Sequence, residues 1–179
     1  PYLTSSGVPN LIPFISPYMV ANVGLSETDL PLIYLFGGLA TLFTSRYIGK
    51  LSDRYGKSKV FTIIAIISVI PILSLTHLPK VPVWVAIITS TLFMIFVSGR
   101  FIPAMAIVSS ASSSEVRGSF MSFNTAAQQI SMSIASLTSS YIIGFTSDGA
   151  LTNYGLVGLL SATCAIMGVL IANTVKRAT

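Results

Sequence analysis

The stretch GKLSDRYGKSK, residues 49–59, is the most densely charged part of the chain, and a long apolar segment lies on each side of it. Hydrocarbon strongly disfavours charged side chains, whereas the aqueous surface of a membrane accepts them. A charged stretch between two apolar segments of membrane length therefore indicates a loop at a membrane surface. We predict that residues 49–59 form such a loop between two membrane-spanning helices.

The composition of the whole chain supports this interpretation. Hydrophobic residues make up 53% of the sequence and charged residues only 8%, with a mean hydropathy of +0.82. A soluble domain ordinarily carries roughly a quarter charged residues, so this chain has too few charges to cover a globule with a solvated surface. Its 179 residues are enough for about six membrane helices of ~20 residues each, joined by short loops.

The composition also argues against several functional classes. The net charge of +5 comes from basic residues at the ends of apolar segments, which does not indicate a nucleic-acid partner. The single cysteine, Cys164, cannot form an internal disulfide. The sequence contains no cluster of His, Asp, Glu or Cys for catalysis or metal binding, so we predict neither an enzyme nor a cofactor.

Six apolar segments divide the sequence, and we expect each to form one transmembrane helix of an all-α membrane protein. Their approximate ranges are 2–23, 30–48, 60–77, 82–110, 119–145 and 152–175. Pro31 falls in the first turn of the second segment, where its missing N–H has no helical partner. Gly37 and Gly38, near the middle of this segment, are expected to let a neighbouring helix come close.

The basic residues give the expected orientation. Of the basic residues near the ends of the apolar segments, Lys80 lies on one side of the predicted bundle and all the others lie on the opposite side. These others are Arg46, Lys50, Arg54, Lys57, Lys59, Arg117, Lys176 and Arg177. By the positive-inside rule, the side with more basic residues is cytoplasmic. Both termini are then cytoplasmic, as six spans require.

The six segments differ in polarity. The third and sixth have almost no hydrogen-bonding side chains at mid-depth, whereas the fifth is rich in Ser, Thr, Asn and Gln, which lipid disfavours. We therefore expect the first, second, fourth and fifth segments to line a polar path, with the third and sixth behind them. Segments one to three and four to six would then be two inverted three-helix repeats.

The pattern Gly49-x-Leu51-x-Asp53-Arg54-x-Gly56-Lys57 resembles the signature loop of the major facilitator superfamily. Its position between the second and third helices agrees with that family, and the resemblance extends over the whole chain at the level of helix order. It implies a fold of twelve membrane helices in two halves, of which this chain is one.

The resemblance also bears on which half this is. Residues 15–24 and 98–105 are similar to the C-terminal half of bacterial drug- or sugar-efflux members. The fifth segment lacks the Gly-Pro-Gly-Gly-rich motif that antiporters of the family often carry in the N-terminal half. A chain that starts at Pro1 without an initiator Met also agrees with a C-terminal half. We expect the other six-helix half to be a partner of this chain.

The function that the resemblance implies is secondary transport in the bacterial inner membrane, surrounded by lipid. The expected activity is efflux of small organic compounds or sugars by alternating access, with the proton as coupling ion. No Asp or Glu lies deep within an apolar segment, so a carboxylate that carries the proton would belong to the other half. The alternative is a non-transporting membrane remnant or an interaction scaffold.

The resemblance assigns the signature loop to a cytoplasmic gate. The gate candidates are Gly49, Asp53, Arg54, Gly56, Lys57, Glu115 and Arg117. We expect Arg54 and Lys57 to pair with Glu115 of the neighbouring loop, and Gly49 and Gly56 to let the chain turn tightly. Exposed ion pairs contribute only about 0–1 kcal/mol each, so a latch would have to act as a network. The alternative is that these charges only fix the topology and solvate the surface.

Arg100 is the strongest candidate for the transport path, because it is a charged residue deep within an apolar segment. It lies roughly 15 Å along the helix from the cytoplasmic end of the fourth segment. A charge at this depth costs at least about 2.5–3.5 kcal/mol unless it meets water or a partner. The partner would be a backbone carbonyl, a polar side chain of the fifth segment, water, the other half or the substrate. Alternatively, Arg100 is structural and extends to the cytoplasmic surface.

The remaining candidates for the path are uncharged: Tyr34, Asn124, Gln128 and Gln129. Gln128 and Gln129 are adjacent, about 100° apart on a helix, so both need not face one cavity. Such side chains either contact a substrate or hold helices together, and Tyr34 either lines a pocket or packs between helices.

Overall fold

The computed structural model describes residues 11–110, 117–147 and 149–178, and its architecture is mostly helical. The helical elements are α2 (Ile12–Tyr18), the π-helix η1 (Met19–Val23), the 3-10 turn η2 (Glu27–Asp29), α3 (Leu30–Tyr55), α4 (Lys57–Ile67), α5 (Val69–Thr76), α6 (Val83–Gly99), α7 (Phe101–Ser110), α8 (Arg117–Ile142) and α9 (Tyr154–Ala178). A short antiparallel hairpin, β1 (Gly144–Phe145) and β2 (Leu151–Thr152), joins α8 to α9.

These elements make six helical segments: α2 with η1, α3, α4 with α5, α6 with α7, α8, and α9. The prediction of a mostly helical protein with six helices is confirmed for the described residues. Two segments, Lys57–Thr76 and Val83–Ser109, are long and apolar enough to cross a membrane. The apolar helices Ile12–Val23 and Tyr154–Leu170 are shorter.

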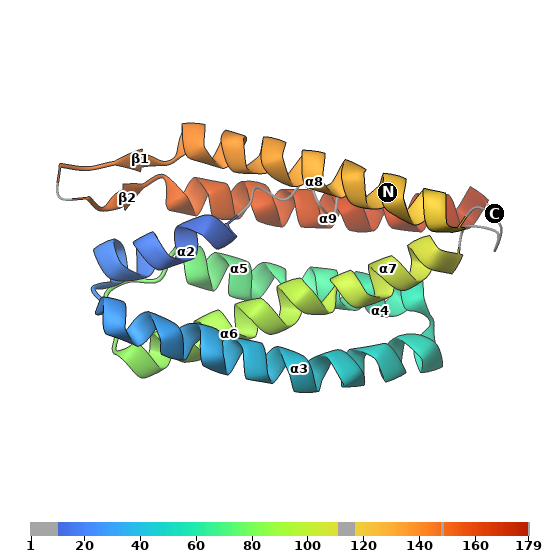
Figure 1. The fold of residues 1–179 in the computed structure, drawn as a ribbon, viewed down its shortest axis with the longest axis horizontal. Helices are drawn as coiled ribbons and strands as arrows, with labels where there is room; N and C mark the ends of the chain where they lie inside the picture. Colours follow the sequence, from blue (N-terminus) through green and yellow to red (C-terminus); the bar gives the residue numbers. More distant parts are fainter. Residues whose placement is uncertain (1–10, 111–116, 148, 179) are drawn as a thin grey trace.

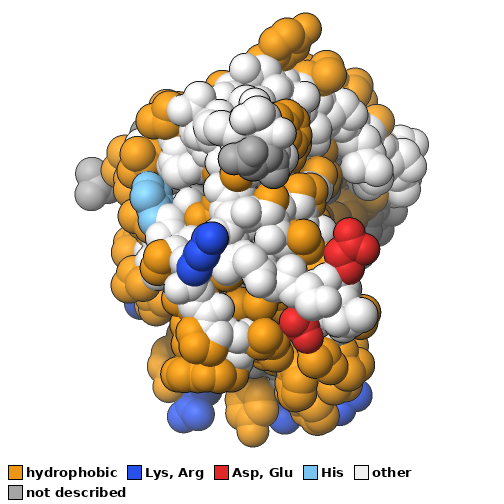
Figure 2. Space-filling model, turned by 90° about the vertical axis from the view of Figure 1, so that its left-hand side faces the viewer, with side chains coloured by type: hydrophobic (Ala, Val, Ile, Leu, Met, Phe, Trp, Pro, Cys, Tyr) orange, Lys and Arg blue, Asp and Glu red, His pale blue; other side chains and the backbone are white. Residues whose placement is uncertain are grey.

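The helices run side by side in an elongated bundle (Figure 1). α8 and α9 pair along one edge, α3 lies at the opposite edge, and the third and fourth segments lie between them. We name one end of the bundle the basic end, after the residues on the two helices that meet there, Arg46, Lys50, Arg54, Lys57 and Lys59. The β-hairpin marks the other end, the hairpin end, where charged side chains are few and scattered (Figure 2).

The charged stretch 49–59 is helical, which corrects the prediction of a loop. α3 continues to Tyr55, α4 begins at Lys57, and only Gly56 lies between them. Lys and Arg are good helix formers, so the helix continues beyond its apolar part with the charged side chains in solvent. It ends at Gly56 because this residue has a φ of +92°, which glycine adopts readily and other residues do not.

Proline interrupts the third and fourth segments, each of which we predicted as one helix. Pro71 lacks the N–H for a helical bond to the residue four positions before it, and the helix breaks at Ser68, between α4 and α5. Pro103 has the same effect in the fourth segment, and the break falls at Arg100, between α6 and α7. Both interruptions lie inside the apolar segments.

The hairpin corrects the predicted boundaries of the fifth and sixth helices, which were expected to reach residue 145 and to begin at residue 152. The amide side chain of Asn22, in η1, stabilises this extended connection. Its Nδ2 donates to the carbonyl oxygen of Leu151 at 2.8 Å, and its Oδ1 accepts from the backbone N–H of Leu151 at 2.8 Å. A side-chain amide offers one donor group and one acceptor, as a backbone residue does, so Asn22 pairs with β2 as a third strand would.

The hydrophobic core falls into two clusters. The larger cluster joins the first segment, the start of α3, α5, α6, the hairpin and the start of α9, and its fully buried members include Met19, Ile33, Ile72, Leu75, Ala86 and Val157. The smaller cluster joins α4, α7 and α9 through Phe61, Ala65, Ala104 and Val169. The larger cluster lies towards the hairpin end and the smaller towards the basic end.

Glycine residues allow several helices to come close together. A Cβ on Gly37 would lie 3.3 Å from Cγ of Met94 in α6, so the predicted close approach at Gly37 is confirmed. At Gly38 no atom of the described residues lies within 4 Å of the position of the missing Cβ, so a close approach there stays a prediction. A Cβ on Gly158 in α9 would lie 2.7 Å from Cβ of Thr76 in α5. Small residues at such contacts are typical of helix packing in membranes.

Candidate functional site

The signature stretch makes a one-residue turn at the basic end. Gly56 provides the positive φ of this turn, whereas Gly49 lies inside α3, which corrects its predicted role in a tight turn. A helical residue needs no special backbone freedom, and no atom lies within 4 Å of the position of the missing Cβ of Gly49. Asp53 and Arg54 are exposed at the end of α3, and the Arg54 guanidinium lies 5.5 Å from the centre of the Tyr55 ring.

Lys57 connects this turn to the fourth segment. Its Nζ donates a hydrogen bond of 3.2 Å to the carbonyl oxygen of Ala106 in α7. A lysine near the C-terminal end of a helix also interacts favourably with the helix dipole. Glu115 and the side chain of Arg117 lie outside the described residues, so their pairing with the gate stays a prediction. Within the described part of the chain, Asp53 forms no ion pair.

Arg100 is buried at the break between α6 and α7, with 7% of its surface exposed. Its backbone N–H donates to the carbonyl of Phe96, and its own carbonyl accepts from the N–H of Ala104, both at 3.3 Å. Among the residues that the structure describes, none forms a hydrogen bond or an ion pair with its guanidinium. The charge is therefore buried in the bundle without a partner from the described chain.

The position of Arg100 on its helix shows which neighbours it faces. Ala104 and Ile107 lie four and seven residues further on, on the same face of the helix. Both pack in the smaller core cluster, with α4 and α9. Arg100 thus lies on the side of the third and sixth segments. A hydrogen bond to a polar side chain of the fifth segment, one of the alternative partners of Arg100, is not formed within the described residues.

Two of the uncharged candidates come together at a methionine of α7. The Nδ2 of Asn124 lies 4.0 Å from Sδ of Met105, and the Nε2 of Gln128 lies 3.7 Å from the same sulfur. Thioether sulfur is a weak acceptor, so these contacts hold α8 against α7 and leave the amides most of their hydrogen-bonding capacity. Gln129 is exposed, on a different face of α8 from Gln128.

Tyr34 connects the first and second segments. Its hydroxyl oxygen lies 2.6 Å from Oγ of Ser16, close enough for a short hydrogen bond between the two hydroxyls. The Tyr34 side chain is 39% exposed, so the ring is only partly enclosed by the described helices.

A tyrosine pair fixes the first segment to its neighbours at the hairpin end. The rings of Tyr18 and Tyr154 stack with their centroids 4.4 Å apart. The Tyr18 hydroxyl donates to the carbonyl of Leu78 at 2.9 Å, and the Tyr154 hydroxyl donates to that of Leu11 at 3.4 Å. Together with the Asn22 pairing, these contacts join α2, η1, the end of α5 and the start of α9.

Comparison with known protein families shows to which family this helical bundle belongs. Residues 3–178 match the model of the Major Facilitator Superfamily, which covers nearly the entire chain. The chain belongs to this superfamily. The comparisons with curated proteins and with solved structures gave no match.

Membership in the Major Facilitator Superfamily places the chain in a family of membrane transporters for small molecules, with lipid around it, and not among enzymes. The predicted family and class are thereby confirmed. The mostly helical bundle is consistent with the fold of this superfamily.

In this major facilitator chain the candidate residues do not meet in one pocket of the described structure. Lys57 contacts α7 from the basic end, and Asn124 and Gln128 contact it from α8. Arg100 lies in the core, at the break between α6 and α7. An open apolar groove of about 560 Å³ lies between α3 and α6, and none of the candidates lines it.

The residues that join the helices at the hairpin end, above all Asn22, were not among the candidates predicted from the sequence. The amide of Asn22 at the end of the first segment was a usable signal, because a partly buried amide needs hydrogen-bond partners. Met105 gave no such signal, since a methionine in an apolar run is ordinary core composition.

Proposed function

We propose that this chain is the C-terminal six-helix half of a proton-coupled efflux transporter of the bacterial inner membrane. Its substrates would be small organic compounds or sugars. The basic end and both termini face the cytoplasm in this proposal, and the two triplets of helices are inverted repeats. The other six-helix half completes the transporter, and the two halves rock around a binding site near mid-depth.

The buried guanidinium of Arg100 is the observation that carries this proposal. Charged residues within membrane spans are rare and mark substrate or ion pathways, because their burial is costly without a partner. Arg100 is 7% exposed and has no partner for its guanidinium among the described residues. Water or a bound substrate would provide that partner at this depth.

The surface of α8 supports the presence of a second half. This helix packs against α9 and α7, and elsewhere it exposes large apolar side chains, such as Phe123 at 75% and Tyr141 at 90%. The amide of Gln129 is exposed as well. Lipid would leave such a polar group without hydrogen bonds, whereas a neighbouring helix can provide them.

Flux measurements on the complete transporter test the proposed function. Proteoliposomes would be given organic cations, organic anions and sugars under an imposed pH gradient, with a pH-sensitive dye inside. We expect flux of one substrate class that is accompanied by proton movement and stops when a protonophore dissipates the gradient. A flux that does not depend on the pH gradient would contradict proton coupling. Correctly inserted protein without flux of any class would favour the scaffold alternative.

Replacing Asp53 by Ala in the complete transporter is expected to slow transport roughly threefold to fivefold without reducing membrane insertion. The loss corresponds to about 0.7–1 kcal/mol, the strength of one exposed ion pair in the gate. A carboxylate in the last turn of a helix interacts unfavourably with the helix dipole, so its removal should not unfold α3. Initial rates per inserted molecule provide the measurement.

The matched control for Asp53 is Glu27→Ala, which removes an exposed carboxylate at the hairpin end. Its transport rate should equal that of the unchanged protein. If the Asp53 variant also transports at the normal rate, the gate does not depend on this carboxylate and the latch is wrong.

A further inference from the structure

The third and fourth segments break in the same way. In each, the break residue lies three positions before a proline: Ser68 before Pro71, and Arg100 before Pro103. The backbone angles nearly coincide, with φ −62° and ψ −18° at Ser68 and φ −67° and ψ −22° at Arg100. The carbonyl of each break residue still accepts a hydrogen bond from four residues further on, at 3.1 and 3.3 Å. Each segment therefore continues as a helix but is weakened at one point.

The two breaks lie at similar depth in the bundle. A Cβ on Gly99, the residue before Arg100, would lie 3.8 Å from Cγ2 of Ile64, which precedes Ser68 by four residues. Four residues are about one helical turn, or roughly 6 Å along the axis. The weak points of two adjacent helices thus lie within about one turn of each other.

The helix pieces on the basic side of the breaks form one unit. Phe61 and Ala65 of α4 belong to the same core cluster as Ala104 of α7, and Val169 of α9 completes this cluster. The hydrogen bond from Lys57 to Ala106 links the same two helices at the basic end. On the other side of the breaks, α5 and α6 belong to the larger cluster instead. The breaks therefore coincide with the division between the two clusters.

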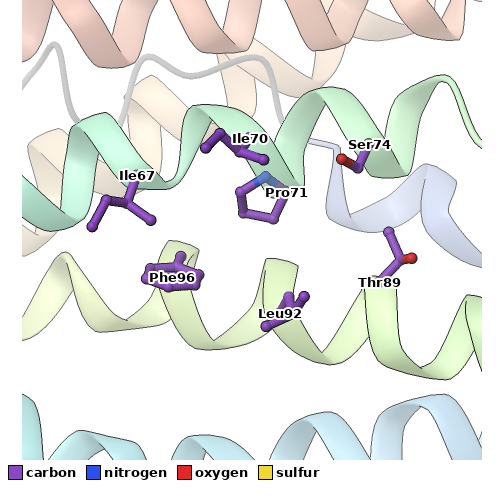
Figure 3. A pocket seen from close by; sticks show the side chains of 7 residues that line it. All are labelled: Ile67, Ile70, Pro71, Ser74, Thr89, Leu92 and Phe96. Atoms are coloured by element: carbon purple, nitrogen blue, oxygen red, sulfur yellow. The ribbon is translucent and has the colours of Figure 1, made fainter.

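An open groove lies at the break of the third segment, and among its lining side chains Ile67, Ile70 and Leu92 are 39%, 68% and 44% exposed. It has a volume of about 180 Å³, and it lies between the third segment and α6 (Figure 3). Ile67 of α4 and Ile70 and Pro71 of α5 line it from one side, and Leu92 and Phe96 of α6 line it from the other. Because this groove is open at the surface of the described chain, the third segment can bend there without displacing a packed core.

We propose that the two proline-linked breaks form a paired hinge, about which α4 and α7 tilt together relative to the larger core cluster. The hinge rests on the proposed transport function, because alternating access requires one end of the bundle to move while the other stays packed. Arg100, at one of the two breaks, moves with the hinge, so tilting changes the surroundings of the buried guanidinium. The Asn22 pairing and the stacked tyrosines hold the hairpin end in place during this motion.

Distance measurements between spin labels on the complete transporter in lipid nanodiscs test the hinge. In a Cys164→Ala background, labels at Lys59→Cys and Ile88→Cys lie on exposed positions of α4 and α6, on opposite sides of the breaks. We expect two distance peaks, whose populations change between acidic and alkaline pH. The control pair, Trp84→Cys and Leu156→Cys, lies at exposed positions of the hairpin end and should give one peak at either pH.

Restoring the missing backbone hydrogen bonds should lock the hinge. In the combined variant Pro71→Ala and Pro103→Ala, we expect loss of the second distance peak and a transport rate at least about tenfold lower. The control is Pro31→Ala, because Pro31 lies in the first turn of α3 and interrupts no helical bond. Single-proline variants replace the combined variant if it does not insert.

The outcomes separate the hinge from the transport function. One narrow peak for the cross-break pair in the unchanged protein, or two peaks that persist after both proline replacements, would overturn the hinge. Two peaks in a protein that shows no flux of any substrate class would overturn the transport proposal and leave the hinge standing.

Discussion

Replacing Arg100 by Met in the complete transporter is expected to remove at least about nine-tenths of transport while leaving the protein as stable as before, or more stable. Burying a charge without a partner costs several kcal/mol, and apolar replacement of buried charges often stabilises by about 1–4 kcal/mol. Met is flexible and fills irregular space in a core. Transport should fall because the substrate loses its charged contact, and a tenfold loss corresponds to about 1.4 kcal/mol.

The measurements for Arg100 are transport per inserted molecule and the thermal unfolding temperature in detergent. Arg100→Lys keeps a positive charge and should retain part of the activity. Phe101→Met, at the next residue, alters a side chain that is 51% exposed and should change neither quantity. A lower unfolding temperature together with normal transport of the Arg100→Met variant would show that Arg100 is structural.

Replacing Gly158 by Leu is expected to destabilise the bundle by roughly 1–3 kcal/mol, the usual effect of overpacking. A Cβ at this position would lie 2.7 Å from both Cβ and Cγ2 of Thr76. Thr76 cannot easily move away, because it is 2% exposed and its Oγ1 donates to the carbonyl of Ile72 at 3.0 Å. The substitution would therefore separate α5 from α9 and loosen the larger core cluster.

The fraction of protein that remains monodisperse after heating measures this effect, and the fluorescence of the single tryptophan, Trp84, reports unfolding independently. Gly38→Leu is the matched control, because it introduces the same side chain where no atom lies within 4 Å of the position of the missing Cβ. Its stability should equal or exceed that of the unchanged protein, since glycine weakens a helix interior. Equal unfolding temperatures for the two variants would contradict the close contact at Gly158.

The number and order of the helices could be predicted because each helix corresponds to one apolar segment and the charged residues lie between these segments. The ends of the helices could not be predicted as well. The charges of residues 49–59 indicated water but not a loop, since a helix with exposed Lys and Arg side chains continues into solvent. Only the backbone conformation at Gly56 ends α3, and the sequence does not say which of two nearby glycines adopts it.

The candidate site was predictable in its residue types and not in its contacts. Arg100 was identified as a buried charge from its depth alone, and it is buried. The direction in which the Arg100 side chain points depends on how α7 packs against α4 and α9. The periodicity of a single segment does not predict this packing. Asn124 and Gln128 were named as separate candidates, and they approach one sulfur because they are four residues apart on one helix face.

The single-residue connection at Gly56 has a mechanical consequence for the proposed motion. A connection of one residue cannot extend, so an axial shift of α3 must displace α4 by nearly the same amount. The hydrogen bond of Lys57 then passes the displacement of α4 to α7. A longer linker would absorb the same shift in its own flexibility. The shortness of this joint, more than its charge, would let a change at one edge of the bundle reach the middle.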